Sequence, residues 1–237
     1  MVRIWLQLSP GQSSPSGTRR PSTEPRKDFN SPSERYIARP LAPAIVAMLL
    51  LWFPLASSGQ VNPGMLLMLF NAADRGVPSA QYELGKMYEE GKGVDQSYDE
   101  AFMWYSEAAE QGFQKAQYKL GTLYHQGKGV KRDYVEAAKW YRKAADQGNP
   151  EAQYNLGVLY YRGEEFPKDY KAAFTWFQKA AEHGVAKAQY QLAVMYANGE
   201  GVAADFDKAV SWLRKSAAQG DAKAEELLLK MGIPEKN

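Results

Sequence analysis

Cysteine is absent from the 237 residues of this chain, and histidine occurs only twice. Without cysteine there is no disulfide framework, no thiolate nucleophile and no zinc site with cysteine ligands. The histidines, His125 and His183, fall at different positions of the sequence pattern, and no serine or carboxylate is predictably placed beside either. The phosphate-binding motifs GxGxxG and GxxxxGK followed by Ser or Thr are missing too. We therefore expect no catalytic residues, no metal site and no cofactor.

A large excess of one charge is lacking as well. The formal net charge is +2, and the first 40 residues hold seven Lys and Arg against three Asp and Glu. The remainder of the chain therefore carries about −2. Domains that bind nucleic acid usually present a basic stripe. We expect no nucleic-acid partner.

Aliphatic side chains are almost missing from residues 9–40, which are rich in serine, proline and arginine. Such a stretch cannot bury enough apolar area to offset its conformational entropy. We therefore predict that residues 1–40 form a disordered leader.

A hydrophobic run of membrane-spanning length is also missing. The apolar segment at residues 41–58 has an uninterrupted core of about ten residues, Ala44–Phe53, with Arg35 and Arg39 before it. A bilayer-spanning helix needs about 20 apolar residues, whereas about 10–14 are typical of the centre of a signal peptide. The segment therefore predicts export to a bacterial periplasm or cell surface, or membrane attachment. The alternative is a buried helix of a cytoplasmic protein.

What the sequence does contain is a repeat with a period of 36 residues. Alanine, tyrosine, tryptophan and glycine recur in register, at Ala80, Ala116, Ala152, Ala188 and Ala224, at Tyr82, Tyr118, Tyr154 and Tyr190, at Trp104, Trp140, Trp176 and Trp212, and at Gly112, Gly148, Gly184 and Gly220. Such periods are typical of solenoids, in which neighbouring repeats share a core. The pattern predicts a half repeat at 59–79, four repeats at 80–223, and a C-terminal capping helix and tail at 224–237.

Each repeat contains two amphipathic helices by the spacing of its apolar residues. Most glycines fall at their boundaries, where a left-handed residue commonly ends a helix. Within residues 108–130 Gly121 is the exception, because it lies inside a predicted helix, where glycine costs about 1 kcal/mol relative to alanine. We attribute it to a close approach of the two helices, which the small Ala193 also permits in the fourth repeat.

The repeat reads AQYKLGTLYHQGKGV at 116–130 and AAKWYRKAADQG at 137–148. This pattern resembles the Sel1-like repeat, a relative of the tetratricopeptide repeat, over about 170 residues. The resemblance implies an all-α fold, a right-handed α-solenoid of helix-turn-helix repeats, that serves as an adaptor or scaffold for a protein partner. The third repeat departs from the pattern, because Glu165, followed by Phe166 and Pro167, stands where a loop glycine is expected. We do not assume the standard turn there.

Positions that vary between repeats on the first helices are candidates for partner binding. They follow one another at spacings of three residues, which places them on one stripe of each helix. By analogy with the parent family, this stripe lines the concave surface; a merely solvated face is the alternative. These positions are Glu83, Lys86, Glu89, Lys119, Thr122, His125, Asn155, Val158, Tyr161, Gln191 and Val194.

The half repeat offers a second candidate site. Leu67 and Phe70 stand where later repeats mostly have polar residues, so this helix is apolar nearly all round. We expect something to cover it, either residues 44–56 of the same chain or a partner.

Two other functions are weighed against the adaptor. A polysaccharide or cell-wall fragment would need exposed aromatic residues in the groove, where Tyr161 is the one clear candidate. A hydrolase would depend on His125 or His183. Some Sel1-like proteins are linked to β-lactam hydrolysis, but that group is rich in cysteine, from which this chain departs.

Overall fold

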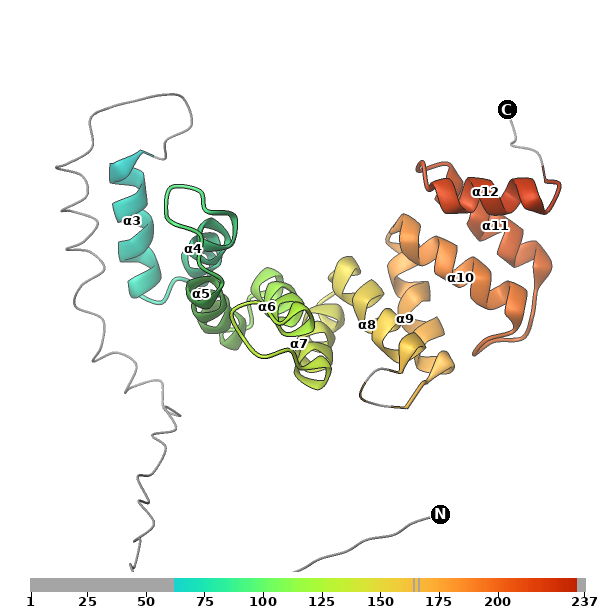
Figure 1. Ribbon diagram of the computed structural model, residues 1–237, viewed down its shortest axis with the longest axis horizontal. Coiled ribbons are helices and arrows are strands. Elements are labelled where there is room, and N and C mark those ends of the chain that lie inside the picture. The colour runs from blue at the N-terminus through green and yellow to red at the C-terminus, as the bar shows by residue number, and fades with distance from the viewer. Residues whose placement is uncertain (1–61, 164, 166, 234–237) are drawn as a thin grey trace, which may run out of the picture. The chain divides into compact units, whose positions relative to one another are not determined.

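The computed structural model describes residues 62–163, 165 and 167–233, which form ten helices and no strand (Figure 1). The predictions for residues 1–40 and 41–58, and the remark on Phe166, concern parts of the chain outside the described residues. Among the described helices, none is long and apolar enough to cross a membrane. The helices are α3 (Pro63–Asp74), α4 (Pro78–Glu90), α5 (Tyr98–Glu110), α6 (Gln114–Gln126), α7 (Tyr134–Asp146), α8 (Pro150–Arg162), α9 (Tyr170–Glu182), α10 (Ala186–Asn198), α11 (Phe206–Ala217) and α12 (Ala222–Lys230).

The helices pack in chain order as four pairs, α4 with α5, α6 with α7, α8 with α9, and α10 with α11. Each second helix of a pair also contacts the first helix of the next pair, while α3 packs on α4 and α12 on α11. The pairs are the four repeats of the sequence. The prediction of an all-α solenoid with a 36-residue period is confirmed.

Side-chain caps start many of the helices. Ser97 accepts a hydrogen bond from the Glu100 N–H at 3.3 Å, and Asp133 accepts one from the Glu136 N–H at 2.9 Å, so both satisfy amides that lack a partner within the helix. Asn149 caps α8 in the same way, with Pro150 in the first turn as the sequence predicts.

Small residues bring the two helices of each pair together. Gly121 is buried in α6, and a Cβ atom there would lie 2.8 Å from the ring of Tyr141 on α7. Gly157 has the same relation to Phe177, at 2.7 Å. The fourth repeat has Ala193 at this position, opposite the smaller Leu213. The explanation of Gly121 by close approach is therefore confirmed.

The tryptophans belong to the core between repeats. Trp176 of the third repeat packs with Tyr141 and Ala144 of the second, and Trp140 of the second packs against the core of the first. Trp104 and Trp176 retain only 3% and 5% exposure. Each repeat therefore completes its apolar core only with its neighbour, as expected for a solenoid.

A buried glutamine joins each first helix to the helix before it. The side-chain Nε2 of Gln81, Gln117, Gln153 and Gln189 donates to the carbonyl oxygen of an alanine eight residues earlier, at 3.2 Å in all four cases. A buried amide that is satisfied in this way fixes the relative position of successive helices, because its loss would leave buried polar groups unpaired.

Candidate functional site

The stripe predicted from sequence lies on one face of α4, α6, α8 and α10. We call it the first-helix stripe and keep the residues predicted above. Its members are half-buried apart from the exposed Glu83. Several of them bond to one another or to the second helices beneath them, as the ion pair of Lys119 with Glu89 and the contact of Thr122 with Tyr141 show.

Charged groups dominate the stripe at the junction of the first two repeats. Lys119 of α6 forms an ion pair with Glu89 of α4, with 2.9 Å between Nζ and Oε2. The hydroxyl of Tyr105, on α5, donates to the same carboxylate at 2.6 Å. Burial, reinforced by this hydrogen bond, raises the pKa of Tyr105 well above its usual value. The tyrosine therefore remains a neutral donor that holds Glu89 in place.

Uncharged polar groups replace this arrangement at the next junction. The Tyr141 hydroxyl lies 3.3 Å from Thr122 Oγ1 and 3.4 Å from His125 Nδ1, both on α6. Burial raises the pKa of Tyr141, while hydrogen bonds with Thr122 and Asn155 oppose that rise. The Asn155 side chain, on α8, thus joins the same cluster from the following repeat.

The stripe becomes largely apolar over α8 and α10. Phe177 replaces the tyrosine beneath it, and Val158 packs against the core that Phe177 belongs to. Tyr161 is held within the chain, since its ring lies edge-on to Tyr170 at 5.3 Å and its hydroxyl donates to Glu200 at 2.9 Å. Burial and the bond to Glu200 raise the pKa of Tyr161 to about 12. These contacts occupy the ring that a glycan would need.

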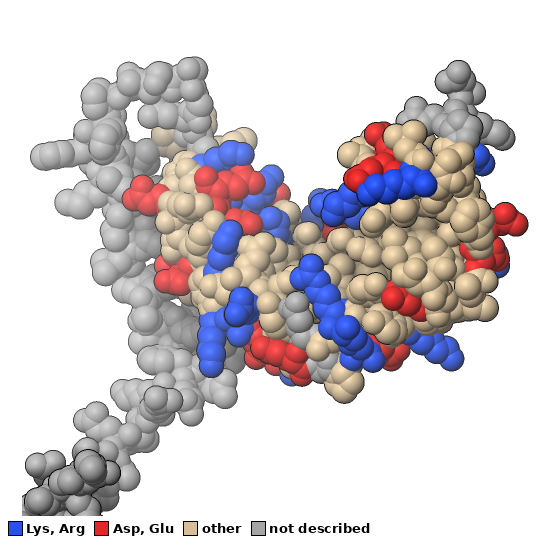
Figure 2. Space-filling model, turned by 45° about the vertical axis from the view of Figure 1, so that its right-hand side comes forward, with Lys and Arg blue, Asp and Glu red and all other residues tan. Residues whose placement is uncertain are grey.

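The first-helix stripe therefore changes character along the chain, from an ion pair through uncharged hydrogen-bonding groups to valines. Acidic and basic side chains are interspersed on the face that Figure 2 shows, in keeping with the small net charge of the sequence. The sequence indicates the varying positions, but not the hydrogen bonds and the ion pair that join them across repeats.

The half repeat differs from the prediction in one residue. Phe70 is only 4% exposed, because α3 turns Leu66, Phe70 and Ala73 toward α4. Phe70 therefore belongs to the core and not to a partner-binding surface. Leu67 lies on the other side of α3, 36% exposed, beside Met68 at 75%. The 44–56 segment that was expected to cover this helix lies outside the described residues.

The two histidines are on separate elements. His125 is on α6, with its ring 5.2 Å from that of Tyr134. His183 follows α9 as an exposed C-cap, where its Nδ1 lies 2.8 Å from the Lys179 carbonyl oxygen. The structure does not bring them together. No cluster of three or more candidate metal ligands is found in the described part of the chain.

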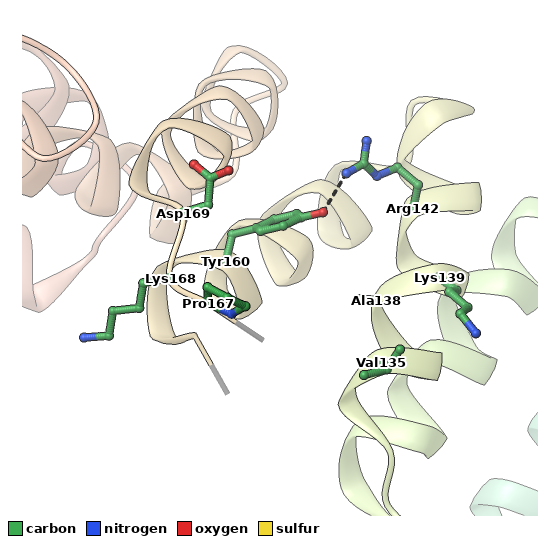
Figure 3. A pocket seen from close by; sticks show the side chains of 8 residues that line it. All are labelled: Val135, Ala138, Lys139, Arg142, Tyr160, Pro167, Lys168 and Asp169. Carbon is green, nitrogen blue, oxygen red and sulfur yellow. Dashed lines mark hydrogen bonds between the residues drawn. The ribbon is translucent and has the colours of Figure 1, made fainter. Parts of the chain in front are cut away.

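A pocket that the sequence reasoning missed lies between α7, α8 and the start of α9 (Figure 3). We call it the α7 pocket. Its volume is about 540 Å³. It is lined by Val135, Ala138, Lys139, Arg142, Tyr160, Pro167, Lys168 and Asp169. The available signal was Ala138, which stands where the first and third repeats have Phe102 and Phe174.

Comparison with known proteins agrees with the repeat pattern that the sequence and the structure show. A family model described as Sel1 repeat matches residues 78–113, 114–149, 150–185 and 186–221, more than half of the chain. A Sel1 repeat protein from Oxalobacter formigenes is similar in structure, with a TM-score of 0.64 and 42% identity over 70% of this chain and 48% of that one.

A second solved structure is c5321, described as a protective antigen present in uropathogenic Escherichia coli strains with an SLR fold. It has a TM-score of 0.68 and 37% identity over 73% of this chain and 37% of that one. The chain thus spans half or less of the length of both relatives. Comparison with curated proteins gives no match.

Proposed function

This chain belongs to the Sel1 repeat family, and from that premise we propose that it is a non-catalytic scaffold that binds a partner protein along the first-helix stripe. Sel1 repeats generally mediate protein–protein interactions. The observation that carries the proposal is the contrast between constant core positions and a stripe whose chemistry changes along the chain, from an ion pair to uncharged polar groups and then to valines. A stripe that served only as a solvated face would not need half-buried hydrogen bonds between repeats.

The chemistry of the stripe constrains the partner. Its charged end, at Glu89 and Lys119, requires polar or charged groups, because an apolar segment there would desolvate the ion pair without compensation. The other end, at Val158 and Val194, favours apolar side chains. We expect a partner segment, helical or extended, that is polar at one end and apolar at the other. First helices on the concave side of the solenoid would offer it a preformed groove at little ordering cost.

The test is an affinity capture from the native host, followed by reconstitution. The test variant carries Glu83→Ala, Lys119→Ala, Asn155→Ala and Gln191→Ala. A matched control variant carries Glu110→Ala, Asp146→Ala and Glu182→Ala, which are exposed at the ends of the second helices. A protein captured by the wild type is then purified and titrated against all three proteins by calorimetry.

The proposal expects stoichiometric binding by the wild type and the control variant, and binding at least tenfold weaker by the stripe variant, because each lost contact is worth about 1 kcal/mol. Equal affinity in the stripe variant would move the site elsewhere, with the exposed Met68 and Leu67 end as the next candidate. Capture of no protein at all would contradict the scaffold function.

We also propose that the protein is exported. The 41–58 segment supports this proposal by its length and by the small residues Ala56–Ser58 that follow its apolar core. N-terminal sequencing of the mature protein from a fractionated bacterial host tests it. A start near residue 59 in the periplasmic fraction is expected, whereas an intact leader in the cytoplasmic fraction would contradict export.

A further inference from the structure

The α7 pocket exists because one junction between repeats lacks a ring that its neighbours have. At the first junction, Phe102 lies edge-on to Tyr124 with 5.4 Å between ring centroids. At the third junction, Phe174 lies in the same way against Tyr196 at 5.3 Å. The second junction has Ala138 at this place, on α7, while Tyr160 of α8 is retained. The neighbouring junctions therefore indicate that the space beside Ala138 fits a phenylalanine side chain.

The loop beside the pocket departs from its counterparts as well. A Cβ atom at Gly129 or Gly201 would overlap a carbonyl oxygen of the preceding repeat. Glu165 stands at the equivalent position with the same left-handed backbone, φ 62°, and it does carry a Cβ atom. The direct backbone approach of the other two junctions is replaced here by a hydrogen bond, in which the Tyr134 N–H donates to the Glu165 carboxylate at 3.2 Å. Two departures from the repeat pattern thus meet at one junction.

The pocket has room for one large apolar side chain together with part of the segment that carries it. Its volume of about 540 Å³ falls within the range of about 300–1,000 Å³ that is usual for ligand sites. Val135, Ala138 and Pro167 provide apolar walls, and Val135 is 42% exposed. A phenylalanine inserted beside Ala138 would restore the contact with the tyrosine of the next repeat that Phe102 and Phe174 make at the neighbouring junctions.

The charges around the pocket favour an acidic ligand. Arg142 donates to the Tyr160 hydroxyl at 2.8 Å and stacks over the Trp176 ring at 4.8 Å, so its guanidinium is held in place. Within the described residues, neither Arg142 nor Lys168 has a carboxylate partner.

The other charged groups of the pocket are already engaged. Lys139 pairs with Glu136 at 2.6 Å. Asp169 uses its carboxylate to cap α9, accepting from the Ala172 N–H at 2.8 Å. Arg142 is therefore the cation that the pocket presents to a ligand, since the Lys168 side chain points away from it (Figure 3).

We propose that the α7 pocket is a second peptide-binding site, which takes a phenylalanine side chain from an acidic segment of a partner protein. The ring lies on Ala138 and Val135, and a flanking carboxylate of the segment pairs with Arg142. Arginine is suited to this role because its planar guanidinium binds a carboxylate with two parallel hydrogen bonds. The site is separate from the first-helix stripe and does not depend on the function proposed for it.

The probe is a fluorescein-labelled peptide, Glu-Asp-Phe-Asp-Glu, whose binding to the full chain is measured by fluorescence anisotropy. A matched peptide with alanine in place of phenylalanine tests the ring. Ala138→Phe fills the pocket with the residue that two other repeats use, so this variant is expected to fold. Arg142→Gln removes the cation and introduces the residue that the third repeat has at this position, Gln178. Lys223→Ala, which removes an exposed cation on α12 outside both proposed sites, is the control variant.

The proposal expects saturable binding that weakens at least tenfold with the alanine peptide and with Ala138→Phe, and several-fold with Arg142→Gln, while Lys223→Ala leaves it unchanged. Thermal unfolding of Ala138→Phe at or above the wild-type temperature confirms that the loss is local. Equal affinity of Ala138→Phe and wild type would overturn the proposal, as would no binding at millimolar peptide.

Two other occupants are distinguished by further variants. Concentration-dependent self-association that is lost in Phe206→Ala would assign the pocket to a second copy of this chain, because Phe206 is 60% exposed between two aspartates. Binding by Phe166→Ala but not by the wild type would assign it to the chain's own loop. Either result would overturn the assignment to a partner.

Discussion

Gly157→Ala is the sharpest test of the packing that underlies the repeat. Gly157 is buried within α8, and a Cβ atom there would lie 2.7 Å from Cδ1 of Phe177 on α9. This is well inside the distance that real carbon atoms keep, so the helices must separate or the ring must turn. The fourth repeat avoids the conflict with Ala193 opposite Leu213.

The expected magnitude is the difference between two effects. Alanine is favoured over glycine inside a helix by about 1 kcal/mol. Overpacking of a close-packed core costs about 1–3 kcal/mol. We therefore expect Gly157→Ala to lower the free energy of unfolding by up to about 2 kcal/mol, although the substitution improves helix propensity.

The double-mutant cycle with Phe177→Leu isolates the cause. Phe177→Leu alone loses stability, because it leaves a cavity. In the presence of leucine the added methyl group has room, as in the fourth repeat, and Gly157→Ala should then stabilise. The coupling energy is expected to be about 1–3 kcal/mol, measured by urea unfolding at equilibrium. The control pairs Phe177→Leu with Gly121→Ala, which faces Tyr141 instead. A Gly157→Ala variant as stable as the wild type, without coupling to Phe177→Leu, would refute the close-approach argument.

Three further predictions concern polar groups of the repeats. Burial raises the pKa of Tyr105 and Tyr141 in the folded chain. Above about pH 10 these two tyrosines therefore ionise only in the unfolded chain. The free energy of unfolding should then fall by about 1.4 kcal/mol per pH unit for each of them. Urea unfolding between pH 9 and 11.5 checks this, and Tyr141→Phe should reduce the slope. Lys119→Ala leaves the half-buried Glu89 without its ion pair and should lower the free energy of unfolding by about 1 kcal/mol. An unchanged free energy of unfolding would contradict a structural role for the pair. His183→Gln should stabilise the chain by about 1 kcal/mol in thermal unfolding, whereas the reverse change Gln147→His should destabilise it.

The reason for the histidine prediction lies in a hydrogen bond that three repeats make and one lacks. Gln111, Gln147 and Gln219 each donate to the buried glutamine of their repeat, at 2.7–2.8 Å. In the third repeat His183 occupies this place, and the Oε1 atom of Gln153 has no partner among the described residues. A glutamine at 183 would supply the missing donor.

Much of the fold could be predicted from the sequence because its determinants are local and recur every 36 residues. Helix boundaries follow from the caps, such as Asn149 with Pro150, and from glycines with left-handed backbone, such as Gly127. The close approach of helices at Gly121 was predicted correctly, because the fourth repeat also has a small residue, Ala193, at the equivalent position. The four repeats thus each show that this helix position requires a small residue.

The candidate sites were less predictable because they depend on contacts between repeats. The varying residues Glu89 and Lys119 were identified as stripe members, but their ion pair joins helices 30 positions apart and follows from the relative placement of two repeats. Phe70 was assigned to a partner surface because later repeats mostly have polar residues at its position. Only the packing of α3 on α4 shows which side is buried.

Departures from a repeat carry more information about function than the repeat itself does. Constant positions are explained by the core, since Trp140 and Trp176 pack between repeats as the period requires. Ala138 and Glu165 are not explained in this way. Ala138 gives up a partly buried ring contact that Phe102 and Phe174 make at the neighbouring junctions. Glu165 adopts a left-handed backbone that costs about 1–2 kcal/mol for a residue other than glycine, and its carboxylate accepts a hydrogen bond from the Tyr134 N–H across the junction. The missing ring therefore leaves the junction open at the α7 pocket, and a binding site would explain why the chain gives up that contact.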